Sequence, residues 1–302
     1  MSHKNRKIIY SAEYEVDIGS HPFPTSKYRL VKDFLINNGF ITPADIEEPS
    51  MPDEELLKTV HTEKYVRKIL DGTLSFADEI KLELPYSSEL AGSAAIVCAG
   101  SVMTAESALE NGAAVHLGGG FHHAYPDHGE GFCVFNDVAV AAAAVTSKGK
   151  KVLIADCDLH QGNGTAAALK DNKLAYTFSM HQENNYPLVK EKSDRDVPLE
   201  DSVVGSKYNS LLRKNLKDIK ESFAPDLVIY VAGSDVYKKD KLGGLDLTME
   251  DIAARDRIIK EEFYDSQIPV AVVLAGGYAQ DLNDTVKIHA AAAVTFLDDK
   301  NL

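Results

Sequence analysis

One short segment of the sequence carries side chains suited to metal binding. Asp156, Asp158 and His160 alternate with Cys157 and Leu159 directly after an apolar run. If the backbone stays extended there, the two carboxylates and the imidazole project from one face, because successive side chains of a strand point to opposite faces. Carboxylate oxygen and imidazole nitrogen are ligands of catalytic zinc and of iron(II). We therefore expect metal ligands in this segment, with Cys157 packed on the opposite face.

A further ligand comes from another part of the chain. Asp235 follows an apolar run that ends at Ala232, and it can complete a set of two Asp and one His. Three protein ligands leave one position open for water or substrate, which distinguishes catalytic from structural zinc sites. Asp156 lies deeper at the strand end, where it can accept a hydrogen bond from a histidine N–H. The predicted ligands are therefore Asp158, His160 and Asp235, and the ion is zinc, with iron(II) also possible.

Hydrolysis at such a metal also needs a proton carrier and an oxyanion donor. Either His122 or His123 can take the proton of metal-bound water and return one to the leaving group near neutral pH. The hydroxyl of Tyr278, which follows two glycines, can stabilise the developing oxyanion. Each of these residues alone is more often structural than catalytic, so the prediction depends on their occurrence together.

Each of these polar segments follows an apolar run that predicts a buried strand. Most of the runs are almost continuously apolar, which is typical of a parallel sheet covered on both faces. The predicted strands are residues 7–10, 113–117, 151–155, 175–180, 227–232 and 270–275. Helical patterns lie between them, at about residues 26–38, 54–70, 87–111, 136–147, 207–222, 248–265 and 281–297. Since ligands bind beyond the carboxyl ends of parallel strands, the polar segments should converge on one site.

The alternation of strands and helices predicts the fold class. It indicates an α/β fold, a single-domain, open, doubly wound and mainly parallel sheet with helices on both faces. The length of 302 residues is compatible with one α/β domain, and no internal repeat or low-complexity linker divides the chain. We therefore expect residues 1–302 to form one catalytic domain.

The composition excludes some partners. The chain has 46 acidic and 32 basic residues, for a net charge of −14. This balance argues against direct nucleic-acid binding, which requires basic patches, and it suits a cationic partner. No window holds the roughly 18 consecutive apolar residues of a membrane span. The composition leaves the oligomeric state open.

The cysteines and the first residues bear on the cellular compartment. Cys98, Cys133 and Cys157 are too few for a disulfide framework and do not have zinc-finger spacing. Such usage is typical of a reducing compartment. The first 17 residues contain no apolar stretch of the kind found in signal peptides. We expect a cytoplasmic protein.

A set of motifs resembles the zinc-dependent histone deacetylases of the arginase–deacetylase superfamily. They occur in the order and spacing of that family and cover nearly the whole chain. The matching elements are His122-His123-Ala, Gly131-Phe132-Cys133, Asn136-Asp137, the segment of residues 156–164, Ser234-Asp235, the segment of residues 242–245, and Gly276-Gly277-Tyr278. The compact length and the opening segment HPFPTSKYRL are most similar to the class IV branch and its bacterial relatives.

The resemblance implies a role for each matching position. Asp158, His160 and Asp235 would bind zinc, and His123 would be the main general base and acid. Asn163 stands where some members place an Asp to partner this second histidine, and a neutral partner would not raise the histidine pKa as a carboxylate does.

Two further catalytic roles follow from the same resemblance. His122, hydrogen-bonded to Asp156, would assist electrostatically. Tyr278 would polarise the acyl carbonyl.

The resemblance also implies a substrate channel and a second ion. Gly131 and Phe132 would line an acyl-lysine channel, with the Phe132 ring against the aliphatic stem. Phe23, Gly276 and Gly277 are assigned to the same channel. A potassium ion behind the zinc site would be held at Asp156, Asp158, His160, Ser179 and Met180. The segment after His181 lacks the Pro-Gly-Thr-Gly run common in the family, which affects the expected rim of the pocket.

The implied activity is hydrolysis of Nε-acyl-lysine on proteins or peptides, with acetyl and also longer fatty acyl groups as acyl chains. Three alternative functions fit the sequence less well. A binuclear manganese ureohydrolase would need acids where this chain has Gly162 and Tyr237. Deacetylation of acetylated polyamines or other small amides usually accompanies an insertion that we do not find. A binding module without turnover would be expected to lack one of the catalytic residues, and all are present.

Overall fold

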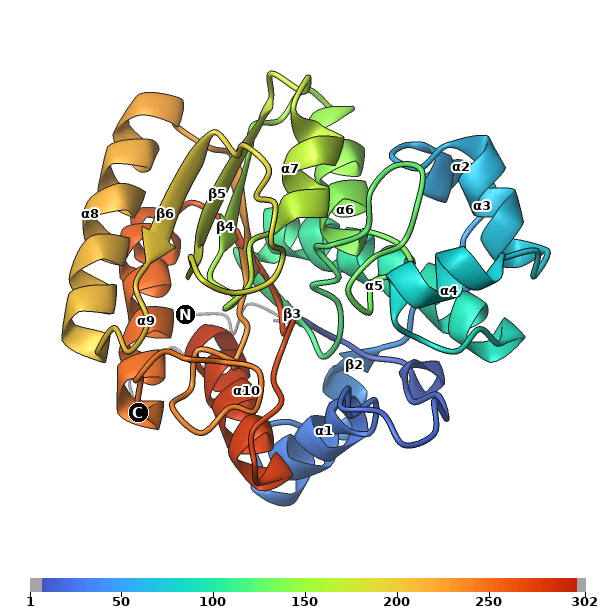
Figure 1. The fold of residues 1–302 in the computed structure, drawn as a ribbon. Coiled ribbons are helices and arrows are strands. Elements are labelled where there is room, and N and C mark those ends of the chain that lie inside the picture. The colour runs from blue at the N-terminus through green and yellow to red at the C-terminus, as the bar shows by residue number, and fades with distance from the viewer. Residues whose placement is uncertain (1–6, 298–302) are drawn as a thin grey trace.

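The apolar runs form one eight-stranded sheet in the computed structural model, which describes residues 7–297 (Figure 1). The strands are β1 (Lys7–Ile9), β2 (Ile46–Glu47), β3 (Ala113–His116), β4 (Val152–Asp156), β5 (Ala175–Gln182), β6 (Arg195–Leu199), β7 (Leu227–Val231) and β8 (Val270–Val273). Their order in the sheet is β2-β1-β3-β8-β7-β4-β5-β6. Every pairing between neighbours is parallel, so all carboxyl ends lie at one edge.

Helices cover both faces of this sheet, because side chains that alternate along each strand are apolar on both sides. The helices are α1 (Lys27–Asn37), α2 (Glu54–Lys58), α3 (Glu63–Leu70), α4 (Phe76–Leu82), α5 (Ser88–Asn111), α6 (Asp137–Thr146), α7 (Asn163–Leu169), α8 (Gly205–Phe223), α9 (Met249–Glu262) and α10 (Leu282–Leu297). Leu153 of β4 packs in the cluster with α1, α8, α9 and α10. Its neighbour Ile154 packs in the cluster with α5, α6 and α7. Figure 1 shows the two helical layers on either side of the sheet. The described residues form a single domain, and the predicted fold class is confirmed.

The differences from the predicted elements have local causes. All six predicted strands are present, while β2 and β6 were not predicted because they are short or polar edge strands. The pattern over residues 54–70 forms two helices, α2 and α3, because the chain turns at residues 59–62. The side chain of Thr62 then accepts a hydrogen bond from the Tyr65 N–H and caps α3. The short helices α4 and α7 were also missed.

The longest helix, α5, belongs to the core. It is the one helix within residues 7–297 that is long and apolar enough to cross a membrane, with a mean hydropathy of 1.3, but 61% of that window is buried inside the fold. It packs against α6 and β3, as expected of a core helix. The first six residues, part of the stretch without signal-peptide character, lie outside the described range.

The parallel arrangement positions the site. Five adjacent strands, β3, β8, β7, β4 and β5, end at the same edge, and each is followed by one of the polar segments singled out in the sequence. The loops after them therefore meet, although they come from distant parts of the chain.

Two buried histidines make stability sensitive to pH. The neutral ring of His61 is held at both nitrogens, by the Tyr125 carbonyl at 3.0 Å and by the Asn136 N–H at 3.0 Å. Burial lowers the pKa of His61 to about 4 and that of His116 to about 3. An unfolded histidine titrates near 6.5, so below that pH the unfolded state takes up protons first. The stabilisation is present above about pH 6.5 and is lost as the pH falls toward the folded values.

We expect acidification from pH 6.5 to about 4 to lower the free energy of unfolding by about 1.4 kcal/mol per pH unit for each of these histidines. Urea denaturation at several pH values measures this slope. His61→Gln keeps an acceptor for the Asn136 N–H and removes one titrating group, so its slope should be shallower than that of the wild type. Equal slopes for the two proteins would contradict the neutral, buried state of His61.

Candidate active site

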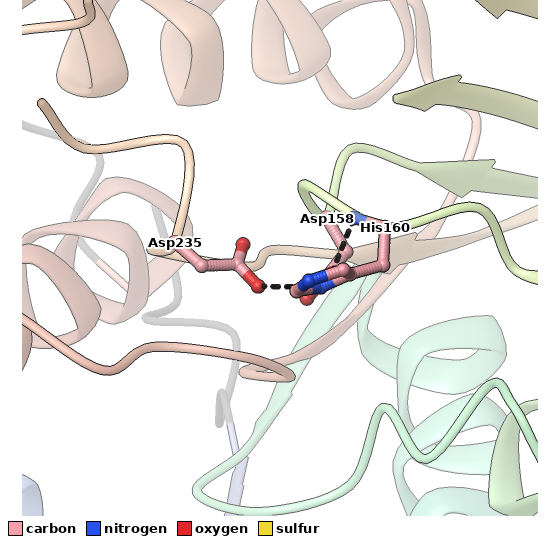
Figure 2. A group of neighbouring side chains, drawn as sticks. All are labelled: Asp158, His160 and Asp235. Atoms are coloured by element: carbon pink, nitrogen blue, oxygen red, sulfur yellow. Dashed lines mark hydrogen bonds and ion pairs between the residues drawn. The ribbon is translucent and has the colours of Figure 1, made fainter. Parts of the chain in front are cut away.

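Three predicted ligands converge at the carboxyl ends of β4 and β7. Asp158 and His160 lie in the loop after β4, and Asp235 lies in the loop after β7 (Figure 2). His160 Nδ1 lies 3.2 Å from Asp158 Oδ1 and 3.3 Å from Asp235 Oδ2. One ligand atom from each residue lies within 4.8 Å of the other two, and all three side chains are buried. The group can hold a metal ion.

The donor set fits a cation. Asp235 Oδ1 accepts a hydrogen bond from the Leu159 N–H at 2.9 Å, whereas its buried Oδ2 accepts no hydrogen bond from residues 7–297 and has only the ion-pair contact with His160 Nδ1. Burial and the neighbouring Asp158 carboxylate raise the pKa of Asp235 to about 7. A buried carboxylate oxygen without a donor, beside a second carboxylate, is costly unless a positive charge compensates it. A bound cation would provide that charge.

Two glycines allow the loops to close on the carboxylates. A Cβ atom at Gly233 would collide with the Asp158 carboxylate, and one at Gly276 would collide with the carboxylates of both Asp158 and Asp235. The Gly276 N–H also donates to Asp158 Oδ2 at 2.9 Å. The backbone after β7 and β8 thus packs directly on the ligands, which fixes their orientation.

The extended geometry assumed for residues 156–160 was wrong. β4 ends at Asp156 and the backbone bends at residues 158–160, so Asp156 does not share the ligand group. Asp156 instead contacts His122, with 2.7 Å between Oδ2 and Nδ1, and its Oδ1 accepts from the Asp158 N–H. This is the histidine-partner position predicted for it. Cys157 is fully buried in the apolar core.

The two adjacent histidines occupy opposite protonation states. Burial alone would lower the pKa of His122, but Asp156 and Asp158 raise it to about 9. Burial and the nearby His122 and His160 hold the pKa of His123 well below its usual value. The two Nε2 atoms lie 3.1 Å apart. At neutral pH a charged His122 therefore stands beside a neutral His123, which is the separation of roles that acid–base catalysis uses.

The neutral His123 has a defined hydrogen-bond partner. Its Nδ1 lies 2.6 Å from Oδ1 of Asn163, the first residue of α7. Because an amide oxygen only accepts, Nδ1 carries the proton and donates it. Nε2 then carries the basic lone pair, which faces the protonated Nε2 of His122.

A pocket of about 210 Å³ leads to the two histidines and to the metal group. Of the predicted site residues it is lined by Phe23, His122, His123, Gly131, Phe132, Asp158, His160, Gly276 and Tyr278. Gly277 does not line it, because this residue packs behind the wall, where a Cβ atom would meet Ser234 Oγ. The rings of Phe23 and Phe132 are stacked with centroids 6.4 Å apart, and Phe132 meets Tyr278 edge-on.

The turn that presents Phe132 is strained. Gly131 and Phe132 have φ values of 52° and 68°, in the left-handed region. For a residue with a side chain this conformation costs about 1 kcal/mol or more, and such outliers occur at functional sites. This backbone conformation places the Phe132 ring in the wall of the pocket.

Tyr278 is held as a hydrogen-bond donor. Burial, together with the Asp235 and Asp158 carboxylates, holds the pKa of its hydroxyl well above the usual value. Its backbone N–H donates to Asp240 Oδ2 at 2.7 Å, which anchors the loop. The hydroxyl therefore keeps its proton at neutral pH and can donate to an oxyanion in the pocket.

Comparison with known proteins agrees with this geometry. The model of the histone deacetylase domain matches residues 21–294. This chain belongs to the histone deacetylase family. Histone deacetylase 2 of Arabidopsis thaliana is 30% identical over 294 residues, which cover 90% of this chain and 74% of that protein. An uncharacterised protein of Picosynechococcus sp. is 36% identical over 286 residues, which cover 94% of this chain and 95% of the relative.

Comparison with solved structures places the fold in the same family. The crystal structure of the HDA15 HD domain superposes with a TM-score of 0.80 at 25% sequence identity, covering 96% of this chain and 90% of that chain. The predicted family resemblance is therefore confirmed. Membership indicates a hydrolase of the deacetylase type, which acts on an acetylated substrate, and the buried Asp–His–Asp group agrees with the general metal dependence of the family.

Two residues of the loop after β5 line the pocket and had no predicted role. Asn185 and Tyr186 form part of its wall. The Tyr186 ring stands edge-on to His123, with centroids 4.9 Å apart, and 6.3 Å from His160. Their position after a strand end was the available signal, but the loop sequence matched no family motif.

Lys27 was also missed. This fully buried residue of α1 donates from Nζ to the Ala275 carbonyl at 2.6 Å, and the Tyr278 ring lies 5.7 Å from its ammonium. Burial lowers the pKa of Lys27 to about 8 despite the nearby carboxylates, of which Asp235 has the largest effect. Lys27 thereby fixes the end of β8, from which Tyr278 enters the pocket.

Three of the predicted potassium ligands, Asp156, Ser179 and Met180, lie on neighbouring strands, and the other two lie in the loop after β4. The register of β4 and β5 pairs Asp156 with Ser179, and Met180 follows in the buried centre of β5. Ser179 Oγ lies 3.0 Å from His181 Nδ1. The potassium site stays a prediction.

Proposed function

We propose that this chain is a zinc-dependent lysine deacylase, which hydrolyses Nε-acyl-lysine on proteins or peptides. The observation that carries the proposal is the pocket. Its Phe23 and Phe132 rings suit an aliphatic lysine stem, and its lining includes the histidine pair together with Asp158 and His160 of the metal group. We place the protein in the cytoplasm, because its three cysteines are buried free thiols.

Zinc, or alternatively iron(II), held by Asp158, His160 and Asp235 would polarise the amide carbonyl and lower the pKa of water when bound. His123 takes the proton of the attacking water at Nε2, while Asn163 holds Nδ1–H. The same proton then passes to the lysine nitrogen as the C–N bond breaks.

The other polar groups of the pocket stabilise charge. His122 stays protonated beside Asp156 and faces the developing negative charge. The Tyr278 hydroxyl donates a hydrogen bond to the oxyanion that forms from the acyl carbonyl oxygen. The released products are a carboxylic acid and a lysine amine.

Longer fatty acyl chains are part of the proposal. A second, smaller apolar cavity shares the walls Phe23, Phe121 and Phe132 with the main pocket and extends toward Leu84 and Val97. Methylene groups beyond an acetyl unit could enter it if these rings moved apart. This supports the acceptance of longer chains that the class IV resemblance implies.

Two enzymatic alternatives differ in metal number or substrate. A second divalent ion would need further carboxylates, and the relevant positions hold Gly162 and Tyr237. Within the described range, Asp158, His160 and Asp235 form the one group suited to an ion. The second alternative is hydrolysis of acetylated polyamines, whose cationic character would also suit the exposed Glu83 beside the pocket.

A substrate panel tests the proposal. With zinc-loaded protein, we expect hydrolysis of acetyl-, octanoyl- and myristoyl-lysine peptides to exceed that of acetylated polyamines in kcat/KM. Mass spectrometry of the products measures the rate of hydrolysis for the peptides and for the polyamines. The zinc content is measured on the same preparation. Turnover confined to the polyamines would instead support the small-amide alternative.

A further inference from the structure

The partner of His123 is an amide, and its two ends have opposite hydrogen-bonding character. Asn163 Oδ1 accepts from His123 Nδ1–H, and Nδ2 carries two donors. Rotation of the amide by half a turn would place Nδ2 against His123. The ring would then have to accept at Nδ1 and carry its proton on Nε2, which would remove the base. The orientation of Asn163 therefore favours one ring tautomer of His123, the same one that the protonated Nε2 of His122 requires at 3.1 Å from His123 Nε2.

Glu130 fixes that orientation. Its Oε1 accepts from Asn163 Nδ2 at 2.9 Å, and its side chain is 18% exposed. An ionised carboxylate has only acceptors, so the nitrogen end of the amide must face Glu130 and the oxygen end must face His123. The Tyr125 hydroxyl donates to Glu191 Oε1 at 3.1 Å and accepts from the same Nδ2 at a longer 3.3 Å, so it supports the same orientation of the amide.

Glu130 also contacts the second neighbour of His123. It accepts a hydrogen bond from the Tyr186 hydroxyl, and burial together with this bond raises the pKa of that hydroxyl. The Tyr186 ring packs edge-on against His123. The other carboxylate oxygen, Oε2, lies 3.4 Å from His128 Nε2. The Glu130 carboxylate thus accepts hydrogen bonds from both side chains that flank His123.

We infer that Glu130 is a positioning residue for His123: through Asn163 it stabilises the ring tautomer with an unprotonated Nε2, and through Tyr186 it holds the ring in place. A carboxylate that accepts from the Asn163 amide also polarises it, which strengthens the bond from its oxygen to the histidine. The inference rests on the proposed amide hydrolysis.

Kinetics of three variants test this role. Glu130→Ala should lower kcat by about 10- to 100-fold, part of the contribution of a general base, while KM for the acetyl-lysine peptide changes far less. Glu130→Gln keeps one acceptor for Asn163 but adds donors that allow either amide orientation, so its kcat should lie between those of the wild type and Glu130→Ala. Asp127→Asn is the matched control, because this acid of the same loop is 72% exposed on its side chain and does not contact Asn163 or Tyr186.

The double variant Glu130→Ala/Asn163→Asp gives the sharpest result. A carboxylate at position 163 has two equivalent ends, so it needs no partner to orient it. In the Asn163→Asp single variant this group would face Glu130 and be repelled, as two carboxylates cannot both ionise at such a distance. We expect the double variant to be more active than either single variant. Additive losses, or an unchanged kcat in Glu130→Ala, would overturn the inference.

A measurement without substrate separates the inference from the proposed function. Nitrogen-15 NMR of labelled histidine, with His123→Gln to assign the signals, reports the protonated ring nitrogen of His123. The wild type should carry the proton on Nδ1, and Glu130→Ala should shift population toward Nε2. If the wild type fails to hydrolyse any acyl-lysine peptide, the proposed function fails while this shift still tests Glu130. An unchanged tautomer in Glu130→Ala would refute the positioning role.

Discussion

Replacement of Asp235 with alanine should abolish both zinc binding and turnover. Asp235 is the ligand that comes from a different strand, so its loss leaves only Asp158 and His160, which are neighbours in one loop. Its Oδ2 is also a buried carboxylate oxygen that accepts no hydrogen bond from residues 7–297, and it lies within the ligand group, where a cation would compensate it. Two ligands do not hold a catalytic zinc ion, which takes three from the protein. Metal analysis and kcat/KM on the same preparation measure the effect.

The loss should not reflect unfolding. Without a cation, burial and the neighbouring Asp158 raise the pKa of Asp235 to about 7, so this carboxylate costs stability above its unfolded pKa. Asp235→Asn, which keeps the size of the side chain, should therefore bind no zinc and yet melt no lower than the metal-free wild type. Asp246→Ala, an exposed acid in the same connection, serves as the control with normal zinc and activity. Stoichiometric zinc with full turnover in Asp235→Ala would remove Asp235 from the ligand set.

The sequence predicted the centre of the fold because central strands of a parallel sheet must be apolar on both faces. Runs such as the one that forms β7 are fully buried and have no other stable environment. The edge strands β2 and β6 carry no such signature, since one side of each is open to solvent. The break between α2 and α3 was missed because both segments share one apolar face, and the interruption depends on a single Thr cap.

The site was predictable as far as it depends on strand ends. His122, Asp158, Asp235 and Tyr278 follow four different strands, and the parallel topology alone brings them to one edge. The bend after Asp156 could not be predicted, because it depends on hydrogen bonds that the carboxylates themselves make within the loop, such as Asp156 Oδ1 to the Asp158 N–H.

The residues that orient the catalytic side chains could not be predicted from the sequence. Lys27 donates a hydrogen bond to Ala275, which lies 248 positions later in the chain, and Glu130 in a loop accepts one from Asn163 at the start of α7. Neither contact produces a periodic pattern or a spacing that could be recognised. The type of chemistry was therefore visible from the strand ends, while the control of protonation and orientation required the tertiary structure.

Tyr278→Phe should lower kcat by about 10²–10³-fold, the usual effect of removing one oxyanion donor, while zinc content stays unchanged. The phenylalanine ring can keep the packing against Phe132 and the ammonium of Lys27, so the variant removes the hydroxyl and little else. Because burial and the nearby carboxylates keep this hydroxyl protonated, its loss takes away a donor across the neutral range. Steady-state kinetics on an acetyl-lysine peptide, with metal analysis, measure the change.

The size and specificity of this effect distinguish a catalytic from a packing role. Tyr237→Phe is the matched control, because Tyr237 lies near the site but directs its hydroxyl to Asp284 at 3.3 Å. It should leave kcat unchanged. If Tyr278 only lined the pocket, its Phe variant would resemble the control or raise KM, since the rim would lose a polar group without loss of transition-state stabilisation. A large fall in kcat with little change in KM instead requires a bond made mainly in the transition state, and an unchanged rate would remove Tyr278 from the mechanism.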